Sequence, residues 1–225
     1  MMKRNYLKKF FNVLKEYQIV AVLVGFILGA TGNEYIRQRI FSPEIKIDFR
    51  QERPFVIKSN KGDDREKVYY PFYQFRLSIY NDSGFYKADK HVVMLTGLWN
   101  LVNDRYEKEE KFEPIRLSPL GYGPETILPQ MRVFAPFGRI GHVDFQKRFE
   151  KGLLSGNPEE PQFRFEMKDM PRWIGSHVAP GKHRFEITVY FDNIPPVSKT
   201  FELSWSGRWY DDYEEMLKQI VIKTI

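Results

Sequence analysis

Histidine is the first residue type to test for chemistry, because the chain has no cysteine. The lack of cysteine excludes disulfides, thiolate zinc sites, iron–sulfur clusters and cysteine nucleophiles. Of the four histidines, only His177 and His183 are close in sequence, on either side of the turn Pro180-Gly181. Their spacing matches no metal motif, since a third ligand would be needed. We therefore expect no metal and no cofactor in this chain.

Serine nucleophiles and phosphate loops are also weakly supported. A nucleophile elbow needs Gly-x-Ser-x-Gly, whereas Ser155 stands in GLLSG and Ser176 in GSH. Gly121-Tyr122-Gly123 is followed by neither a lysine nor a helix signature. The acidic residues of 211–215 (DDYEE) lack the central glycine of a calcium loop and predict the first turn of a short helix. Paired catalytic carboxylates cannot be recognised among 29 acids without geometry.

Aromatic side chains beside turns are the best remaining candidates for a binding role. Trp99 lies in an apolar stretch and Trp205 continues the apolar alternation of residues 201–205, so both are predicted to be core residues. Trp173 and Trp209 stand beside turns, with basic and phenolic neighbours that suit stacking on a sugar ring or a partner side chain. The candidate binding surface comprises Arg172, Trp173, Arg208, Trp209 and Tyr210.

The charge of the chain is concentrated near its N-terminus. The formal net charge is +6. Residues 1–16 hold five basic and one acidic side chain, which leaves 30 basic against 28 acidic side chains in the rest. A nearly neutral remainder lacks the charge that binds phosphate backbones, so we expect no nucleic-acid partner.

An uncharged stretch from Tyr17 to Asn33 predicts a membrane anchor. Its centre, residues 19–30, reads IVAVLVGFILGA and is the most apolar part of the chain. Such a stretch reaches about 26 Å as a helix, close to the hydrocarbon thickness of about 30 Å. We predict a transmembrane anchor helix and its extension over residues 17–40. A cleaved signal peptide ending near Ala30-Thr31-Gly32 and a buried helix of a soluble protein are the alternatives.

The flanks of this anchor predict its orientation and contacts. Five basic residues precede it and four occur in residues 34–50, a small bias towards a cytoplasmic N-terminus and an extracytoplasmic domain. Residues 1–16 predict a basic amphipathic tail, and its contacts with membrane lipid are assigned to Lys3, Arg4, Lys8, Lys9 and Lys15. In the anchor, Ala21, Gly25 and Gly29 stand four residues apart. Small residues at this spacing form a groove in which a second helix can pack closely. A homodimer through the anchor helix is therefore a further hypothesis, with its contact at these three residues.

The periodicity changes from helical to alternating after Ser42-Pro43. Apolar and polar residues alternate over 44–49, 75–80 and 185–191, which is typical of strands with one buried and one wet face. Short strands without long helices between them favour two packed antiparallel sheets. Residues 44–225 are therefore predicted to form a mainly β domain, an immunoglobulin-like or jelly-roll-like antiparallel β-sandwich.

The C-terminal hairpin gives the sharpest structural expectation for this domain. Its two strands alternate in phase across a short Pro195-Pro196 loop, so their apolar residues should share one buried face. These residues are Phe185, Ile187, Val189, Phe191, Phe201, Leu203 and Trp205. The surplus length of the domain is assigned to a charged loop at residues 59–67 and to a long irregular region at 114–171, with about three short strands and a brief helix around Phe145 to Leu153.

The stretch from Ala179 to the C-terminus carries a family resemblance. Its features are Pro180-Gly181, a strand ending near Asn193, Trp205-x-Gly207-x-Trp209, an acidic cluster with Met216, and an apolar strand at 220–225. In these features the chain resembles uncharacterised membrane-anchored proteins of bacteria and archaea with a single β-sandwich domain. The resemblance covers about a fifth of the chain. It implies the architecture, and it implies no activity or site residues.

Three hypotheses for the function follow. The leading one is a membrane-tethered, non-enzymatic interaction or scaffolding module, whose sheet edges or loops bind a protein partner at the membrane surface. The alternative is an envelope carbohydrate-binding module, which the 13 Tyr and 4 Trp suggest. The third is an envelope hydrolase, which would need a close pair of titratable side chains in its largest cleft.

Overall fold

The computed structural model divides the chain into two units, Met1–Ser42 and Pro43–Ile225. The described residues are 17, 20, 22, 25–26, 29, 42–63, 67–110, 112–117, 126–149, 160–167 and 177–225. At positions 63 and 177 the description covers the backbone alone.

The first unit is helical and exposed at its six described positions before residue 42, which are Tyr17, Val20, Val22, Gly25, Phe26 and Gly29. Among the residues described, no helix combines the length and the apolar composition needed to cross a bilayer. Most of the predicted anchor, residues 17–40, and the whole predicted tail, residues 1–16, lie outside the described residues. The membrane anchor therefore stays a prediction.

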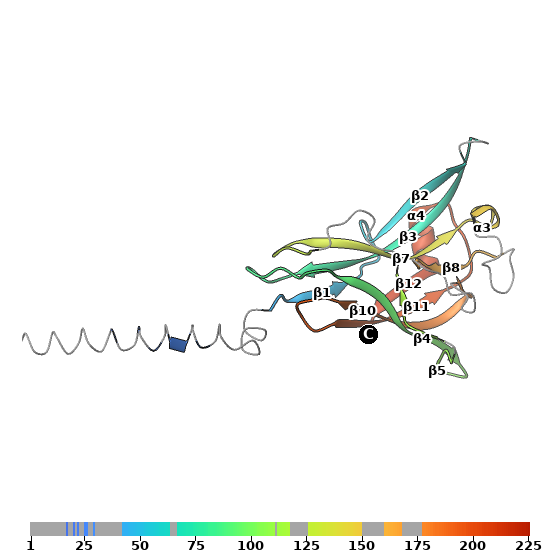
Figure 1. Ribbon diagram of the computed structural model, residues 1–225. Coiled ribbons are helices and arrows are strands. Elements are labelled where there is room, and N and C mark those ends of the chain that lie inside the picture. The colour runs from blue at the N-terminus through green and yellow to red at the C-terminus, as the bar shows by residue number, and fades with distance from the viewer. Residues whose placement is uncertain are drawn as a thin grey trace, which may run out of the picture. The chain divides into compact units, whose positions relative to one another are not determined.

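The second unit is mainly β and contains two antiparallel sheets of six strands each (Figure 1), as the sequence predicts. The first sheet consists of β1 (Ile45–Asp48), β2 (Val56–Asp63), β3 (Val68–Asn81), β7 (Arg132–Gly141), β8 (Phe163–Phe165) and β9 (His177–Val178). The second sheet consists of β4 (Val92–Val102), β5 (Arg105–Lys108), β6 (Ile115–Arg116), β10 (Gly181–Tyr190), β11 (Val197–Trp205) and β12 (Ile220–Thr224). The short helices α3 (Val143–Phe149) and α4 (Tyr213–Gln219) accompany them.

One long strand organises each sheet. β3 pairs along one edge with β2 and then with β1, and along its other edge with β7, after which β8 and β9 follow. β4 pairs along one edge with β10 and along the other with β5 and β6, and β11 and β12 follow β10. Apart from β2, the strands at the sheet edges are therefore short, since β1, β5, β6, β9 and β12 have two to five residues each.

The inner faces of the two sheets meet in one core. Phe137 of β7 stacks on Phe185 of β10, with ring centroids 5.5 Å apart, and this contact joins the sheets. Phe185 also stacks on Phe201 of β11 at 5.3 Å. Phe191 follows the end of β10 and is partly buried against this core. The predicted buried face of the hairpin is confirmed for Phe185, Ile187, Val189, Phe201, Leu203 and Trp205, each at most 2% exposed.

Trp99 is not a core residue, so its prediction is wrong. β4 has an extra residue where the register shifts between Glu186 and Ile187 of β10. Leu95 before this bulge and Leu98 after it are both buried. Odd-numbered residues therefore face the core before the bulge, and even-numbered residues face it after the bulge. Trp99 consequently lies on the outer face of the second sheet, where it is partly buried.

The two predicted insertions are more regular than the sequence indicates. The predicted short strands and brief helix of residues 114–171 correspond to β6, β7, β8 and α3, but β7 is longer than expected. Residues 59–63 belong to β2, because pairing with β3 outweighs the weak strand propensity of these polar residues. β7 lies within 114–171 and is a central strand of ten residues. Its Pro136 is tolerated beside a register shift. Its Gly138 leaves room for Phe163, whose Cζ would lie 2.2 Å from a Cβ atom at that position.

The turn after β3 is closed by a fully buried amide. Asn81 donates through Nδ2 to the backbone oxygen of Tyr86 at 2.6 Å and to that of Ile127 at 3.1 Å. Its Oδ1 accepts a hydrogen bond from Ser83 Oγ at 2.8 Å. These bonds satisfy the buried side-chain amide of Asn81.

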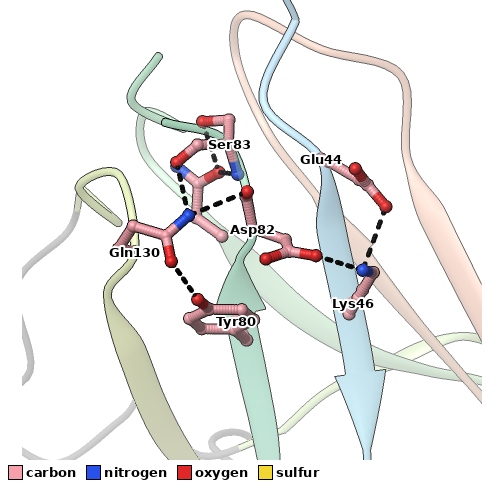
Figure 2. Close-up of polar contacts among 7 residues, drawn as sticks. Glu44, Lys46, Tyr80, Asp82, Ser83 and Gln130 are labelled. Atoms are coloured by element: carbon pink, nitrogen blue, oxygen red, sulfur yellow. Dashed lines mark hydrogen bonds and ion pairs between the residues drawn. The ribbon is translucent and has the colours of Figure 1, made fainter. Parts of the chain in front are cut away.

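A surface network surrounds the same turn (Figure 2). Gln130 donates through Nε2 to the backbone oxygen of Asp82 at 2.9 Å and accepts from the hydroxyl of Tyr80. Lys46 of β1 forms ion pairs with Asp82 and, at 3.1 Å, with Glu44. The hydrogen bond from Lys46 holds the pKa of Asp82 below its ordinary value.

Candidate functional site

The best-defined candidate site is built around α4 and the loop that precedes it. We name it the α4 corner and define it by Gln51–Arg53, Lys58, Tyr73, His142 and residues 206–217. Its elements are the loop between β1 and β2, the strands β2 and β3, the turn after β7, the loop after β11, and α4 itself.

The sequence of α4 accounts for its position. Asp212 is the N-cap, and its side chain accepts a hydrogen bond from the backbone N of Glu215 at 3.0 Å. Acidic residues occupy the first turn and Lys218 the last, as the helix dipole favours. Met216 and Leu217 are buried and fix the helix to the core. The predicted acidic first turn of a short helix is confirmed.

The loop between β11 and α4 is held in a defined shape. The backbone N of Ser206 donates to the oxygen of Gln219 at 2.9 Å, and Ser206 Oγ donates to Gln219 Oε1 at 2.8 Å. Gly207 has a φ of +81°, and a Cβ atom there would stand 2.7 Å from Pro180 Cγ. Glycine is therefore required at this turn, which presents Trp209 two residues later.

Four aromatic rings form a row across the corner. The ring of Tyr213 lies 6.2 Å from that of Tyr73, and Tyr73 lies 5.2 Å from Trp209. Trp209 in turn meets the ring of His142 edge-on at 5.6 Å. The row joins α4, β3, the loop before α4 and the turn after β7. Trp209 is partly buried, so part of its indole is accessible to a partner.

The hydroxyl of Tyr73 is a structural donor. It lies 3.1 Å from the backbone oxygen of Asp211 and 3.2 Å from that of Tyr210. Burial, assisted by the charges of Asp211 and Asp212, raises the pKa of Tyr73 to about 12, so the hydroxyl keeps its proton at neutral pH. Lys58 Nζ bonds the backbone oxygen of Asp211 and lies 3.4 Å from its carboxylate. The loop is therefore fixed to β2 and β3.

A pocket of about 450 Å³ opens at the Tyr213 end of the row. Gln51 donates through Nε2 to the backbone oxygens of Leu217 and, at 2.8 Å, Ile220, which fixes one wall to the end of α4. The guanidinium carbon of Arg53 lies 5.3 Å from the centroid of the Tyr213 ring. Burial raises the pKa of Tyr213, whose hydroxyl donates to Val56 O at 3.0 Å. The lining residues are Gln51, Glu52, Arg53, Tyr213, Glu214 and Leu217.

Several polar side chains of the corner make contacts within the domain. His142 Nδ1 lies 3.2 Å from an Asp144 carboxylate oxygen, but the described contacts place no serine or threonine hydroxyl against this histidine. Both tyrosine hydroxyls are committed to backbone oxygens. Within the described residues, no group of three histidine or acidic side chains is arranged to hold a metal ion. His183, considered above as a ligand, is buried and bonded to Asn100 and to the backbone oxygen of Ala179.

The structure describes only part of the predicted site residues. Trp209 and Tyr210 are partly buried in the corner and Arg208 is exposed beside them. Arg172 and Trp173 lie outside the described residues. Gly25 and Gly29 are helical and exposed, and a Cβ atom at either would meet nothing within 4 Å. Ala21 and the predicted lipid contacts Lys3, Arg4, Lys8, Lys9 and Lys15 also lie outside the described residues.

Sequence reasoning missed the residues that hold Trp209 in place. Tyr73 could have been found, because it extends the inward-facing series Phe75, Leu77 and Ile79 by one step. Lys58 and Gln51 carry no such signal, since their partners stand more than 150 positions away in the chain.

Comparisons of this chain with models of protein families, with curated proteins and with solved structures returned no match. The resemblance of its C-terminal stretch to membrane-anchored single β-sandwich proteins stays a hypothesis.

Proposed function

We propose that this chain is a single-pass, membrane-tethered, non-enzymatic module that binds a protein partner at the membrane surface. The observation that carries the tether is the exposure of apolar side chains on opposite sides of a helix. Val20 is 54% and Val22 71% exposed, and helical residues two positions apart point about 200° away from each other. A helix in water hides one apolar face in a core, whereas lipid solvates every side.

The N-terminus is assigned to the cytoplasm and the β domain to the extracytoplasmic side, with the basic residues of 1–16 on anionic lipid. The strand order supports an immunoglobulin-like sandwich for that domain. β1-β3-β7 in one sheet and β11-β10-β4 in the other follow the neighbour order A-B-E and G-F-C of that fold. This order favours the immunoglobulin-like alternative over the jelly roll.

The α4 corner is the surface assigned to the protein partner. Its pocket has a size that accommodates one or two side chains. Aromatic rings with an arginine beside them are typical of the centre of a protein interface, and the charged residues around them suit its polar rim. The sheet edges are weaker candidates, because most edge strands have only two to five residues. Contact through a fixed loop and helix also matches the general placement of binding residues on rigid scaffolds.

Site-directed photo-crosslinking in intact cells tests this assignment. A photoreactive amino acid replaces Glu214 at the pocket rim, and a matched probe replaces Glu107 on β5, which is also exposed. We expect one crosslinked protein from position 214 and its loss when Trp209→Ala is added. Identical products from both positions, or none from position 214, would refute the corner as the partner site.

Alkaline carbonate extraction tests the tether. Val22→Lys together with Phe26→Lys should release the chain from membranes, because two ammonium groups at a helix centre oppose insertion. Leu128→Lys is the matched control, since Leu128 is as exposed as Val20 but belongs to the β domain. Release of the control variant, or retention of the double variant, would contradict the tether. Protease protection in oriented vesicles then tests which side carries the β domain.

A further inference from the structure

The outer face of the second sheet carries an indole ring that lies against the sheet backbone. Trp99 of β4 reaches back over Gly97, where a Cβ atom would stand 2.2 Å from Cη2 and 2.5 Å from Cζ3 of the indole. Only a residue without a side chain permits this approach. The six-membered ring of the indole therefore lies over the strand at Gly97, and because Trp99 is only partly buried, part of its side chain stays accessible.

A pre-oriented guanidinium stands beside this ring. Arg184 of β10 is directly opposite Trp99 in register. Its guanidinium carbon lies 3.7 Å from the centroid of the Tyr106 ring, and Nη2 lies 3.4 Å from Glu202 Oε2, which also accepts from the Tyr106 hydroxyl at 2.7 Å. The guanidinium is thus held between a ring and a carboxylate, which fixes its orientation. Among the contacts of the described residues Nη1 has no acceptor, so that edge is available to a carboxylate in solution.

Further basic residues share this face. Lys108 of β5 is paired in register with Trp99, and Lys223 of β12 is paired with Glu202. Lys182 stands two residues before Arg184 on β10 and therefore points to the same side of the sheet. These residues and Arg184 supply four positive charges, against the two negative charges of Glu202 and of Glu186, which stands two residues after Arg184 on β10. The face is complementary to an anionic ligand.

We propose that this face binds an acidic oligosaccharide, with a hexuronate ring stacked on Trp99 and its carboxylate bound by Arg184 and Lys108. The axial C–H groups of a pyranose ring pack on an indole, while the carboxylate stands at the ring's edge. Neighbouring strands lie about 4.8 Å apart, so a cation on each side of Trp99 is within reach of one sugar unit. An acidic peptide would use the charges but would offer no pyranose face to the accessible part of the indole.

A row of hydroxyls runs along the same face. Thr188 Oγ1 lies 2.8 Å from Thr96 Oγ1 and 2.8 Å from Ser198 Oγ, so the row crosses β4, β10 and β11. Thr188 is buried, and Thr96 Oγ1 also donates to Glu186 Oε1 at 2.7 Å. The exposed hydroxyl of Ser198, at the end of the row, is the one that can donate to or accept from a further sugar unit. These residues lie in strands that contribute no residue to the α4 corner, so this site is additional to the proposed protein contact.

The test is a calorimetric titration of the full chain in detergent micelles. Tetragalacturonic acid is the acidic probe, maltotetraose the neutral one, and tetraglutamate the acidic peptide. We expect tetragalacturonic acid to bind at least tenfold more tightly than either. Trp99→Ala and Lys108→Glu should each weaken its binding at least tenfold, and Arg184→Lys should weaken it severalfold by removing the fork while keeping the charge. Lys108 is exposed, so its variant reports binding without a folding defect.

Two matched controls make the result specific. Arg132→Lys should leave the affinity unchanged, because Arg132 is likewise stacked on a tyrosine, Tyr80 at 5.1 Å, but belongs to the first sheet. Trp209→Ala should abolish the partner crosslink and spare the sugar, so the two proposals fail separately. Equal binding of the acidic and neutral sugars, binding of tetraglutamate as tight as that of tetragalacturonic acid, absence of binding, or wild-type affinity in Trp99→Ala would each overturn the proposal.

Discussion

The indole of Trp209 packs on the phenol ring of Tyr73, with centroids 5.2 Å apart and an interplanar angle of 59°. A residue of the loop before α4 is thereby held by a residue of β3 whose own side chain is fully buried. Trp209 consequently contributes to the stability of the domain and also offers an accessible edge. Both tryptophans of Trp205-x-Gly207-x-Trp209 therefore pack against the core, and they differ in how much of the side chain is buried.

Truncation of these two tryptophans should have graded effects on stability. Trp205 is 2% exposed, and Trp205→Ala should cost about 3–5 kcal/mol of unfolding free energy. Trp209→Ala removes a partly buried ring and should cost about 1–2 kcal/mol. Thermal unfolding of the purified variants measures both. Equal losses would show that Trp209 is as much a core residue as Trp205.

Removal of the buried amide at the turn after β3 should destabilise the domain. Asn81→Ala removes a fully buried side chain and its two hydrogen bonds to the backbone oxygens of Tyr86 and Ile127, so we expect a loss of about 2–3 kcal/mol. Lys46→Ala, which breaks the exposed ion pair with Asp82 (Figure 2), should leave the melting temperature nearly unchanged. Thermal unfolding of the two variants checks this prediction. A larger fall in melting temperature in Lys46→Ala than in Asn81→Ala would show that the ion pair, and not the buried amide, stabilises this turn.

The carboxyl group of Glu202 should titrate below its ordinary range. The hydrogen bond from Tyr106 is the main cause, and the contact with Arg184 adds to it, so the pKa of Glu202 is lowered in the folded state. A lowered carboxyl pKa stabilises the fold above the unfolded pKa, and this contribution is lost as pH falls through the folded pKa. Tyr106→Phe should move the pKa of Glu202 upwards in a carbon-detected NMR titration, whereas an unchanged value would exclude this hydrogen bond as the cause.

A methyl group at Gly97 should displace Trp99. The Cβ atom of Gly97→Ala would overlap the far edge of the indole, so the ring must lift off the strand. We expect a changed near-ultraviolet tryptophan signal and at least tenfold weaker binding of tetragalacturonic acid. Gly84→Ala is the control, because a Cβ atom there meets nothing within 4 Å. An unaltered tryptophan signal in Gly97→Ala would mean that the indole does not depend on this glycine.

Local pattern was sufficient for elements whose boundaries are set by nearby residues. β11 occupies residues 197–205, as predicted, because Pro195-Pro196 interrupts the chain before it and its alternation is unbroken. The acidic first turn of α4 is readable for the same reason, since capping depends on residues within one turn.

Features that depend on a distant strand were not readable. The bulge in β4 exists only relative to β10, so the sequence of β4 alone places Trp99 in the wrong phase. The length of β7 was underestimated because Pro136 and Gly138 weaken its strand pattern, and both residues are explained only by its neighbours Arg76 and Phe163. The α4 corner depends on contacts such as Lys58 to Asp211, which local periodicity does not encode.

The short edge strands have a consequence for the behaviour of many copies crowded together. An unpaired edge is a template on which another chain adds a strand, and long apolar edges lead to aggregation. In the part of the chain that the structure describes, the edges are divided among strands of two to five residues, and the longer β2 carries Lys58 and Lys61. A charged or short edge offers few consecutive hydrogen bonds to a second copy. The described edges therefore give a second copy of the domain little backbone on which to add a strand.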